Sequence, residues 1–245
     1  MSASASNSNV LKGKLLFPFI APPNGGKGTQ TRILSERYGL PTFDMGATFR
    51  AIMKEGADPQ LAEELNSYMS QGRLVPIETV MKVFTKGFLE LAEKHPKAKG
   101  FILDGFPRSL EQASALQELV KSFGAQIGTV VYLNVSIPVV EKRSTGRRFC
   151  SQDAGHVYNI YEPKFQPRED NRCDIDGAEL IIRPDDEPET VKKRLLEYQK
   201  ETDPIIDFFK KAGLLVEING EQQPELVTAE IEKDLKPMLA LIPAS

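Results

Sequence analysis

The sequence of 245 residues predicts an α/β fold, in which a parallel sheet is covered by helices on both faces. Short apolar runs rich in Val, Ile, Leu and Phe alternate with longer segments of helical spacing. This alternation indicates parallel strands, because the connection between two parallel strands usually contains a helix. Two stretches, 47–71 and 149–184, break the alternation. We expect them to be insertions at the carboxyl edge of the sheet, where ligands bind in open α/β folds.

The expected strands are short runs rich in β-branched and aromatic residues. They cover Leu15–Ala21, Phe101–Leu103, Val130–Leu133 and Leu214–Ile218. Pro18 lies inside the first strand and cannot donate a ladder hydrogen bond, although this strand should be central. We therefore expect a bulge or an unusual pairing there.

The expected helices have apolar residues at helical spacing and recognisable ends. Ser109 and Thr190 can act as N-terminal caps or first-turn residues, and Gly213 ends the helix before it. The first insertion has the pattern of short helices, whereas the second is polar, turn-rich and poor in strands. The helices expected between and after the strands cover Lys27–Tyr38, Ile77–Glu93, Ser109–Phe123, Ile137–Arg147, Pro188–Ala212 and Pro224–Leu241.

The composition restricts the function classes. The net charge is −3 and both signs are mixed along the chain, which argues against nucleic acid and anionic membranes as partners. No apolar run approaches the roughly 20 residues that cross a bilayer. The Ser- and Asn-rich residues 1–13 are expected to be a disordered tail without targeting features. Two cysteines are too few for a secreted disulfide framework, so we expect a cytoplasmic protein.

A glycine-rich turn follows the first strand. The stretch APPNGGKGTQ contains Gly25, Gly26, Lys27, Gly28 and Thr29 where a strand passes into a helix. Such a loop directs backbone N–H groups and a lysine at phosphate oxygens, next to the N-terminus of the helix. The stretch departs from the usual spelling, since Ala21 occupies the first glycine position and Asn24 stands where a glycine is usual. We interpret it as a phosphate-binding loop rather than an ordinary turn.

Three motifs in order resemble those of the adenylate kinase family, the long-lid nucleoside monophosphate kinases. They are GKGTQ at 26–30, GFILDGFPRSLEQA at 100–113, and TGRRF at 145–149 followed by LIIRPDDEPETVKKRL at 180–195. The resemblance covers about 15–235. It implies a P-loop NTPase-type sheet of five parallel strands, with a core of 14–43, 72–147 and 185–245. It also implies a helical insertion that binds the nucleoside monophosphate at 44–71 and a lid at 148–184.

The resemblance implies a Mg²⁺-dependent enzyme, expected to be a monomer, that converts ATP and AMP reversibly into two ADP. Phosphoryl transfer requires positioning and positive charge, and arginines pair bidentately with phosphate oxygens. Arg143 and Arg147 are four residues apart on one expected helix and so would share a face. By resemblance the catalytic residues are Lys27, Arg108, Arg147, Arg183 and Arg194. The ATP site would comprise Asn24, Gly25, Gly26, Lys27, Gly28, Thr29, Arg143 and Arg147.

The resemblance also assigns residues to AMP. Gln112 would read the adenine edge, and an amide is suited to pair bidentately with adenine. Met45 replaces the family's threonine and Ala47 its aspartate near the metal shell. Metal placement would therefore rely more on Asp104, which holds Mg²⁺ through water. The expected AMP site comprises Met45, Arg50, Val75, Gly105, Arg108, Gln112, Arg183 and Arg194.

The expected lid contains two C-x-x-D pairs, Cys150 with Asp153 and Cys173 with Asp176. Zinc accepts thiolate and carboxylate ligands, so a Cys₂Asp₂ site is one interpretation. Other members of the resembled family have a metal-free polar cluster at these positions, and a disulfide is a third alternative. His156 is near enough in the sequence to replace one ligand.

Two further interpretations of function stay open. One is a kinase that uses GTP as donor or another nucleoside monophosphate as acceptor. The other is a degenerate homologue that binds nucleotides and transfers little, and the departures at Ala21, Asn24, Met45 and Ala47 are what favour it.

Overall fold

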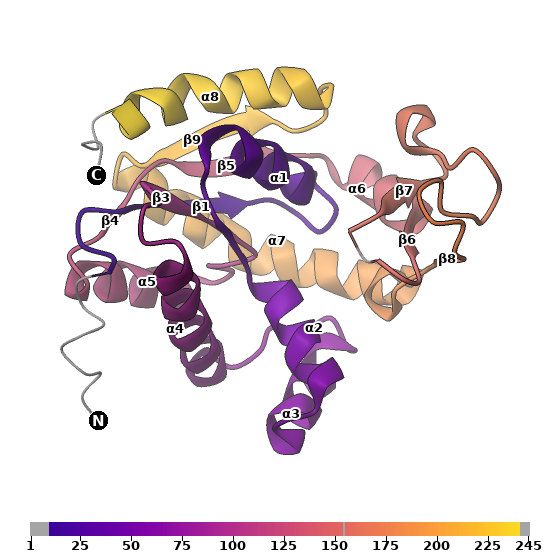
Figure 1. Ribbon diagram of the computed structural model, residues 1–245, viewed down its shortest axis with the longest axis horizontal. Coiled ribbons are helices and arrows are strands. Elements are labelled where there is room, and N and C mark those ends of the chain that lie inside the picture. The colour runs from indigo at the N-terminus through magenta and orange to yellow at the C-terminus, as the bar shows by residue number, and fades with distance from the viewer. Residues whose placement is uncertain (1–9, 154, 241–245) are drawn as a thin grey trace.

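The computed structural model describes residues 10–153 and 155–240, and it confirms the α/β fold with a parallel sheet between helices (Figure 1). The strand order is β2-β3-β1-β5-β9, and β4 also pairs with β1, so the sheet has six strands rather than the five expected. The two strands beyond the apolar runs, β2 and β4, are only three and two residues long. The sheet comprises β1 Leu15–Ile20, β2 Thr42–Asp44, β3 Gly100–Asp104, β4 Gln126–Ile127, β5 Val130–Asn134 and β9 Leu215–Asn219.

The bulge expected near Pro18 is present on one side of β1. Leu16 is paired with Ile127 and Phe19 with Val131, so two residues of β1 face three residues of the partner chain. One extra residue in one strand defines a bulge. Gly128 lies in it, and a Cβ there would be 2.7 Å from Cε1 of Phe17. On the other side, Pro18 pairs in unbroken register with Leu103.

The helices cover both faces of the sheet as expected. Leu16 packs in a cluster with α4 and α5, whereas Phe17 packs in a cluster with α1 and α8, because successive side chains of a strand point to opposite faces. In the described ranges, no helix has both the length and the apolar character needed to cross a bilayer. The helices of the core are α1 Lys27–Tyr38, α4 Ile77–Lys94, α5 Leu110–Ser122, α6 Ile137–Gly146, α7 Pro188–Lys211 and α8 Pro224–Ala240.

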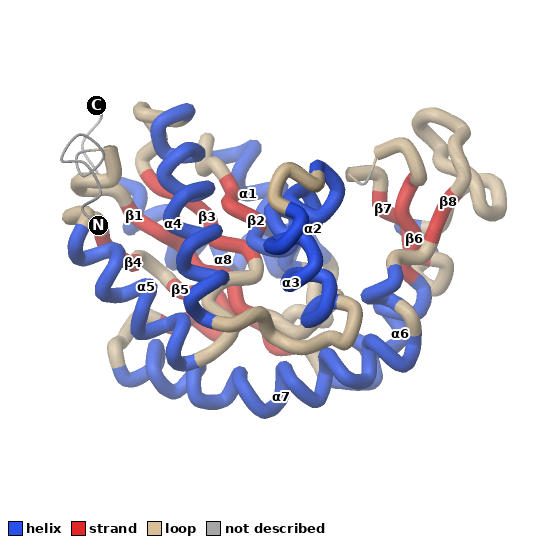
Figure 2. Tube along the Cα trace, turned by 90° about the horizontal axis from the view of Figure 1, so that it is seen from below, coloured by secondary structure: helices blue, strands red, loops and turns tan. Residues whose placement is uncertain are grey.

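Two insertions project from this core (Figure 2). The first consists of α2 Met45–Glu55 and α3 Pro59–Met69, with side-chain caps from Asp44 and Asp58. The second, the lid, is richer in strands than its polar sequence indicates. It forms an antiparallel sheet in the order β7-β6-β8, with the short 3₁₀ helices η2 Pro163–Phe165 and η3 Pro184–Asp186. Its strands are β6 Arg147–Cys150, β7 Val157–Asn159 and β8 Leu180–Ile181.

Two sequence-based expectations need correction at their edges. Residues 1–9 of the expected tail lie outside the described residues, but Leu11 is only 1% exposed and packs in the core, and Gly13 N donates to Gly124 O. The packed structure therefore begins before residue 14. The helix expected to include Arg147 ends at Gly146, and Arg147 begins β6. Arg143 and Arg147 consequently do not share one helix face.

Candidate active site

The loop between β1 and α1 has the backbone that its glycines require. Gly26 has φ +92°, and a Cβ on Gly25 would lie 3.0 Å from Cβ of Ala21, so neither position accepts a larger residue without strain. Lys27 is the first residue of α1 and folds back over the loop, where its Nζ donates to the carbonyl oxygen of Ala21 at 3.1 Å. The loop thus presents an ammonium group and the N-terminus of a helix to the same space.

The surroundings of Lys27 lower the pKa of its ammonium group. Burial lowers its pKa to about 8, while Asp104 opposes this shift and Arg108 and Arg194 add to it. The lysine is therefore partly neutral near pH 8 without a ligand. An anion bound beside it would favour the charged form and raise the pKa.

Two carboxylates face one another at the carboxyl ends of β2 and β3. Asp44 and Asp104 are register partners in these adjacent strands. Burial raises the pKa of Asp104, against the attraction of Lys27 and with the repulsion of Asp44. Sequence reasoning singled out Asp104 and missed Asp44, whose Oδ1 also accepts from Ala47 N at 2.9 Å. A carboxylate at the end of a strand was the signal, but β2 is too short for its sequence to be recognised as a strand.

Five of the residues expected to bind AMP belong to α2, the segment after β3 and the start of α5, namely Met45, Arg50, Gly105, Arg108 and Gln112. Arg108 Nε donates to the carbonyl oxygen of Gly105 at 2.9 Å, and Gln112 Oε1 accepts from Arg108 N at 2.8 Å. Gly105 has φ +75°, and a Cβ there would be 2.9 Å from Nη2 of Arg108, so glycine makes room for the guanidinium group. Arg50 lies one helical turn from Gly46, whose added Cβ would be 3.2 Å from Nη1 of Arg50.

A second group of arginines lies where the lid joins the core. Arg147 forms a bidentate ion pair with Asp186, with Nη2 to Oδ1 at 2.6 Å and Nε to Oδ2 at 2.9 Å. Arg194 of α7 has its Nη1 3.8 Å from the same Oδ1. The guanidinium carbon of Arg183 lies 3.3 Å from the centre of the Phe149 ring. Arg143 donates to the carbonyl oxygen of Gly220 at 3.1 Å, which places it beside the end of β9.

These groups line one cleft of about 1610 Å³. It brings together side chains that are far apart in the sequence, and cations predominate among its charged lining residues near the loop. Sequence reasoning had assigned Asp104 to magnesium and the others to catalysis or nucleotide binding, and each of the following lines this cleft: Asn24, Gly25, Gly26, Lys27, Gly28, Thr29, Met45, Arg50, Val75, Asp104, Gly105, Arg108, Gln112, Arg143, Arg147, Arg183 and Arg194.

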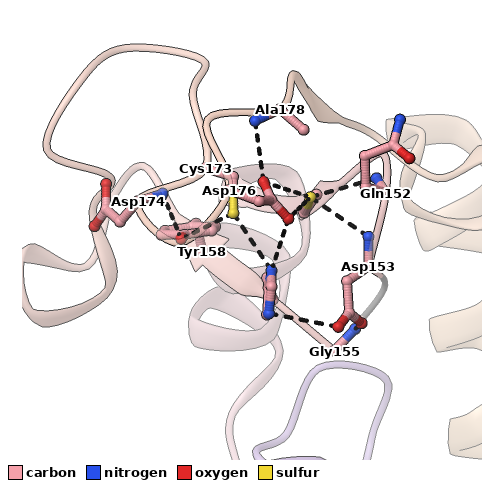
Figure 3. A network of polar contacts seen from close by, with 10 residues as sticks. Gln152, Asp153, Gly155, Tyr158, Cys173, Asp174, Asp176 and Ala178 are labelled. Carbon is pink, nitrogen blue, oxygen red and sulfur yellow. Dashed lines mark hydrogen bonds and ion pairs between the residues drawn. The ribbon is translucent and has the colours of Figure 1, made fainter.

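The lid contains a separate polar cluster, which we call the lid cluster: Cys150, His156, Cys173 and Asp176 (Figure 3). One ligand atom from each of the four lies within 4.8 Å of the others. His156 Nδ1 is 3.4 Å from Cys173 Sγ and 3.3 Å from an Asp176 oxygen. The backbone N–H of Ala178, followed by the contacts with both thiols, lowers the pKa of Asp176 to about 2.

The lid cluster differs from the expected set by one residue. His156 occupies the place expected for Asp153, whose carboxylate instead lies 3.4 Å from Nε2 of His156. The spacing C-x-x-D pointed to Asp153, but it is an imidazole nitrogen of His156 that lies within 4.8 Å of both thiols and of the Asp176 carboxylate. Both cysteines are buried and free of disulfide bonds.

Comparison with known proteins gives consistent matches. The family model described as adenylate kinase matches residues 19–214. The adenylate kinase of Archaeoglobus fulgidus is 41% identical over 219 residues, covering 89% of this chain and 96% of that protein. The adenylate kinase of Bacillus subtilis is 40% identical over 213 residues, with 87% and 94% covered. That of Streptomyces avermitilis is 38% identical over 218 residues, with 89% and 95% covered.

Proposed function

The chain belongs to the adenylate kinase family of phosphotransferases, and from this premise we propose that it converts ATP and AMP reversibly into two ADP. The observation that carries the proposal is the cleft in which Lys27 and two groups of arginines meet beside the glycine-rich loop. The triphosphate of ATP and the single phosphate of AMP, meeting end to end, would need positive charge of this kind from both sides.

Each part of the cleft has a role in this reaction. The backbone N–H groups of Gly25–Thr29 and the ammonium of Lys27 bind the β- and γ-phosphates of the donor. Arg50 and Arg108 bind the phosphate of AMP, which attacks the γ-phosphorus in line as an anionic nucleophile. Arg147, Arg183 and Arg194 surround the phosphoryl group during transfer, and their guanidinium forks stabilise its equatorial oxygens.

The remaining assignments concern the base and the metal. In this proposal Gln112 donates its amide N–H to the adenine of AMP, Met45 and Val75 are apolar neighbours of the ring, and Arg143 flanks the donor base. Magnesium, when bound, neutralises charge on the donor phosphates. Asp104 and Asp44 fit a hydrated Mg²⁺ ion, because two adjacent carboxylates end in the cleft near Lys27 and Mg²⁺ keeps most of its water ligands.

A donor and acceptor panel tests this function. The purified protein is assayed for diphosphate formation with Mg²⁺, using ATP or GTP as donor and AMP, CMP, UMP or GMP as acceptor. We expect the largest kcat/KM with ATP and AMP. A larger kcat/KM with GTP than with ATP would show that GTP is the phosphoryl donor instead. Tight nucleotide binding with no turnover for any pair would instead identify a nucleotide-binding homologue without the activity.

We further propose that the lid cluster binds zinc through Cys150, His156, Cys173 and Asp176. Two thiols, one imidazole and one carboxylate form a donor set that tetrahedral zinc accepts, and their mutual proximity supports it. Asp153 would then orient His156 through Nε2, as carboxylates commonly do for zinc-bound histidines. Elemental analysis of the purified protein should give one zinc per chain. Absence of metal with reduced thiols would favour the hydrogen-bonded cluster, and loss of both thiols would favour a disulfide.

We propose that the protein acts in the cytoplasm, which its free thiols support, and that it is a monomer. Sedimentation of the purified protein tests the oligomeric state, and fractionation of cells tests the location.

A further inference from the structure

Asn24 is the residue of the phosphate loop whose identity the backbone alone does not explain. Its φ is +59°, in the left-handed region, where glycine is the least strained residue and asparagine one of the few tolerated alternatives. A glycine at this position would adopt the same backbone at lower cost. The amide side chain must therefore be examined for what it contacts.

The side chain of Asn24 leaves the loop and reaches two distant segments. Its Nδ2 donates to Oγ of Ser144 on α6 at 2.6 Å and lies 3.4 Å from Oδ1 of Asp186 on η3. Ser144 and Asp186 are both almost completely buried, at 0% and 1% exposed. The loop is thus joined by one amide to the two segments that flank the lid.

Asp186 connects this amide to the arginines. Its Oδ1 accepts from Nη2 of Arg147 at 2.6 Å and is 3.8 Å from Nη1 of Arg194, and it is the same oxygen that faces Asn24. The direction in which the Asp186 carboxylate points decides where the Arg147 guanidinium lies. A donor hydrogen bond from the loop therefore restricts the carboxylate and, through it, the arginine.

The side-chain oxygen of Asn24, Oδ1, argues against the view that this residue only stabilises the fold. Its Oδ1 is buried and has no hydrogen-bond partner among the residues that the structure describes. A buried acceptor without a partner and a left-handed non-glycine residue both disfavour folding. Asn24 therefore has two features that lower the stability of the folded protein, and a glycine at this position would have neither.

We propose that Asn24 is a positioning residue that couples the phosphate loop to Asp186 and so fixes Arg147 relative to phosphates bound in the loop. This inference rests on the proposed phosphotransferase function. Arg147 acts on the phosphoryl group in flight, whereas the loop binds the donor before and after transfer. Disturbing their relative position should therefore lower kcat more than it changes the binding of AMP.

The test is Asn24→Gly, which keeps the backbone conformation and introduces no charge. We expect kcat to fall about tenfold while KM for AMP changes less than about twofold, since a small misplacement affects the transfer step most. The matched control is Asn171→Gly, the other left-handed asparagine, which is exposed in the lid and has φ +63°. This control should retain the wild-type kcat. Urea unfolding of each variant separates loss of catalysis from loss of folded protein.

A double-mutant cycle with Asp186→Asn tests whether Asn24 affects kcat through Asp186. If Asn24 acts through Asp186, adding Asn24→Gly to Asp186→Asn should lower kcat by less than about twofold further. If Asp186→Asn does not fold, Arg147→Lys is the second partner for the same cycle. A wild-type kcat in Asn24→Gly, an equal loss on both backgrounds, or an equal loss in Asn171→Gly would each overturn the inference. An inactive wild-type protein would refute the proposed function instead.

Discussion

The cleft and the lid cluster both gather ionisable groups, but they balance charge in opposite ways. The cleft draws its cations from segments spread along the chain, among them Lys27, Arg108 and Arg194, and their mutual repulsion contributes to the low pKa of the lysine. The lid cluster takes its groups from one short stretch, and thiol, imidazole and carboxylate contact one another. The excess positive charge of the cleft therefore favours the binding of a polyanion. The groups of the lid cluster can instead bind a single cation or form hydrogen bonds with one another.

The largest expected effect on activity comes from removing the positive charge of Lys27 from the cleft. Lys27→Met keeps most of the stem and removes the ammonium group. We expect kcat/KM to fall about 10³-fold, because a charge aimed at the transferring phosphates is lost. Steady-state kinetics measures this loss. The control is Lys86→Met on the exposed face of α4, and a comparable loss in that variant would contradict a specific role for Lys27.

Two neighbouring arginines allow a matched comparison at the border between the regions. Arg147 lines the cleft and pairs with Asp186, whereas Arg148 donates to the backbone carbonyls of Thr145 and Arg147. Arg147→Lys keeps the charge but loses the bidentate fork, so kcat should fall about 10²-fold. Arg148→Lys should leave kcat within about twofold of the wild type. Equal effects in both variants would show that the fork of Arg147 has no special part in transfer.

The lid comparison concerns His156 and Asp153. His156→Ala removes a proposed zinc ligand and should abolish stoichiometric zinc in the purified protein. Asp153→Ala removes only the carboxylate that contacts Nε2 of His156, and should weaken zinc affinity about tenfold without abolishing binding. Competition with a chromogenic chelator measures both affinities. A greater loss from Asp153→Ala than from His156→Ala would restore Asp153 as the ligand.

The smallest expected effect is the uptake of a proton by Lys27 when a nucleotide binds in the cleft. In the free protein the pKa of Lys27 is about 8, below its value of 10.5 in an unfolded chain. A bound polyphosphate raises that pKa, so nucleotide binding at pH 8 should take up about half a proton, and much less at pH 6, where the lysine is already charged. Calorimetry in two buffers of different ionisation enthalpy measures the uptake. Lys27→Met should lose it.

The α/β fold and most of the cleft could be predicted because their signals are local. The alternation of apolar strands and amphipathic helices predicted the sheet, and the glycines around Lys27 predicted the loop. The bulge beside Pro18 followed from the missing N–H group of proline. The convergence of the arginines on one cleft was implied by the resemblance of their motifs to those of the family.

What sequence reasoning missed depends on contacts between distant segments or on very short elements. Asp44 ends a strand of three residues, too few to show a period. The lid strands are as short, and their polar composition hid them. Spacing favoured Asp153 as a ligand and offered His156 only as a substitute, whereas the structure brings His156 into the lid cluster. The contact of Asn24 with Asp186 spans 162 positions, and no local pattern could indicate it.

The ion pair between Arg147 and Asp186 also joins the two ends of the lid, since one residue begins its first strand and the other ends the turn before α7. Everything between them leaves and re-enters the core at one place. Contacts beyond this junction also hold the segment to the core, since Lys164 Nζ lies 3.8 Å from a carboxylate oxygen of Glu225 on α8 and Asn159 Nδ2 donates to the carbonyl oxygen of Arg143 on α6. A chimera that exchanges the lid at this junction would therefore test whether the proposed zinc site transfers with the lid while the proposed phosphoryl transfer stays with the core.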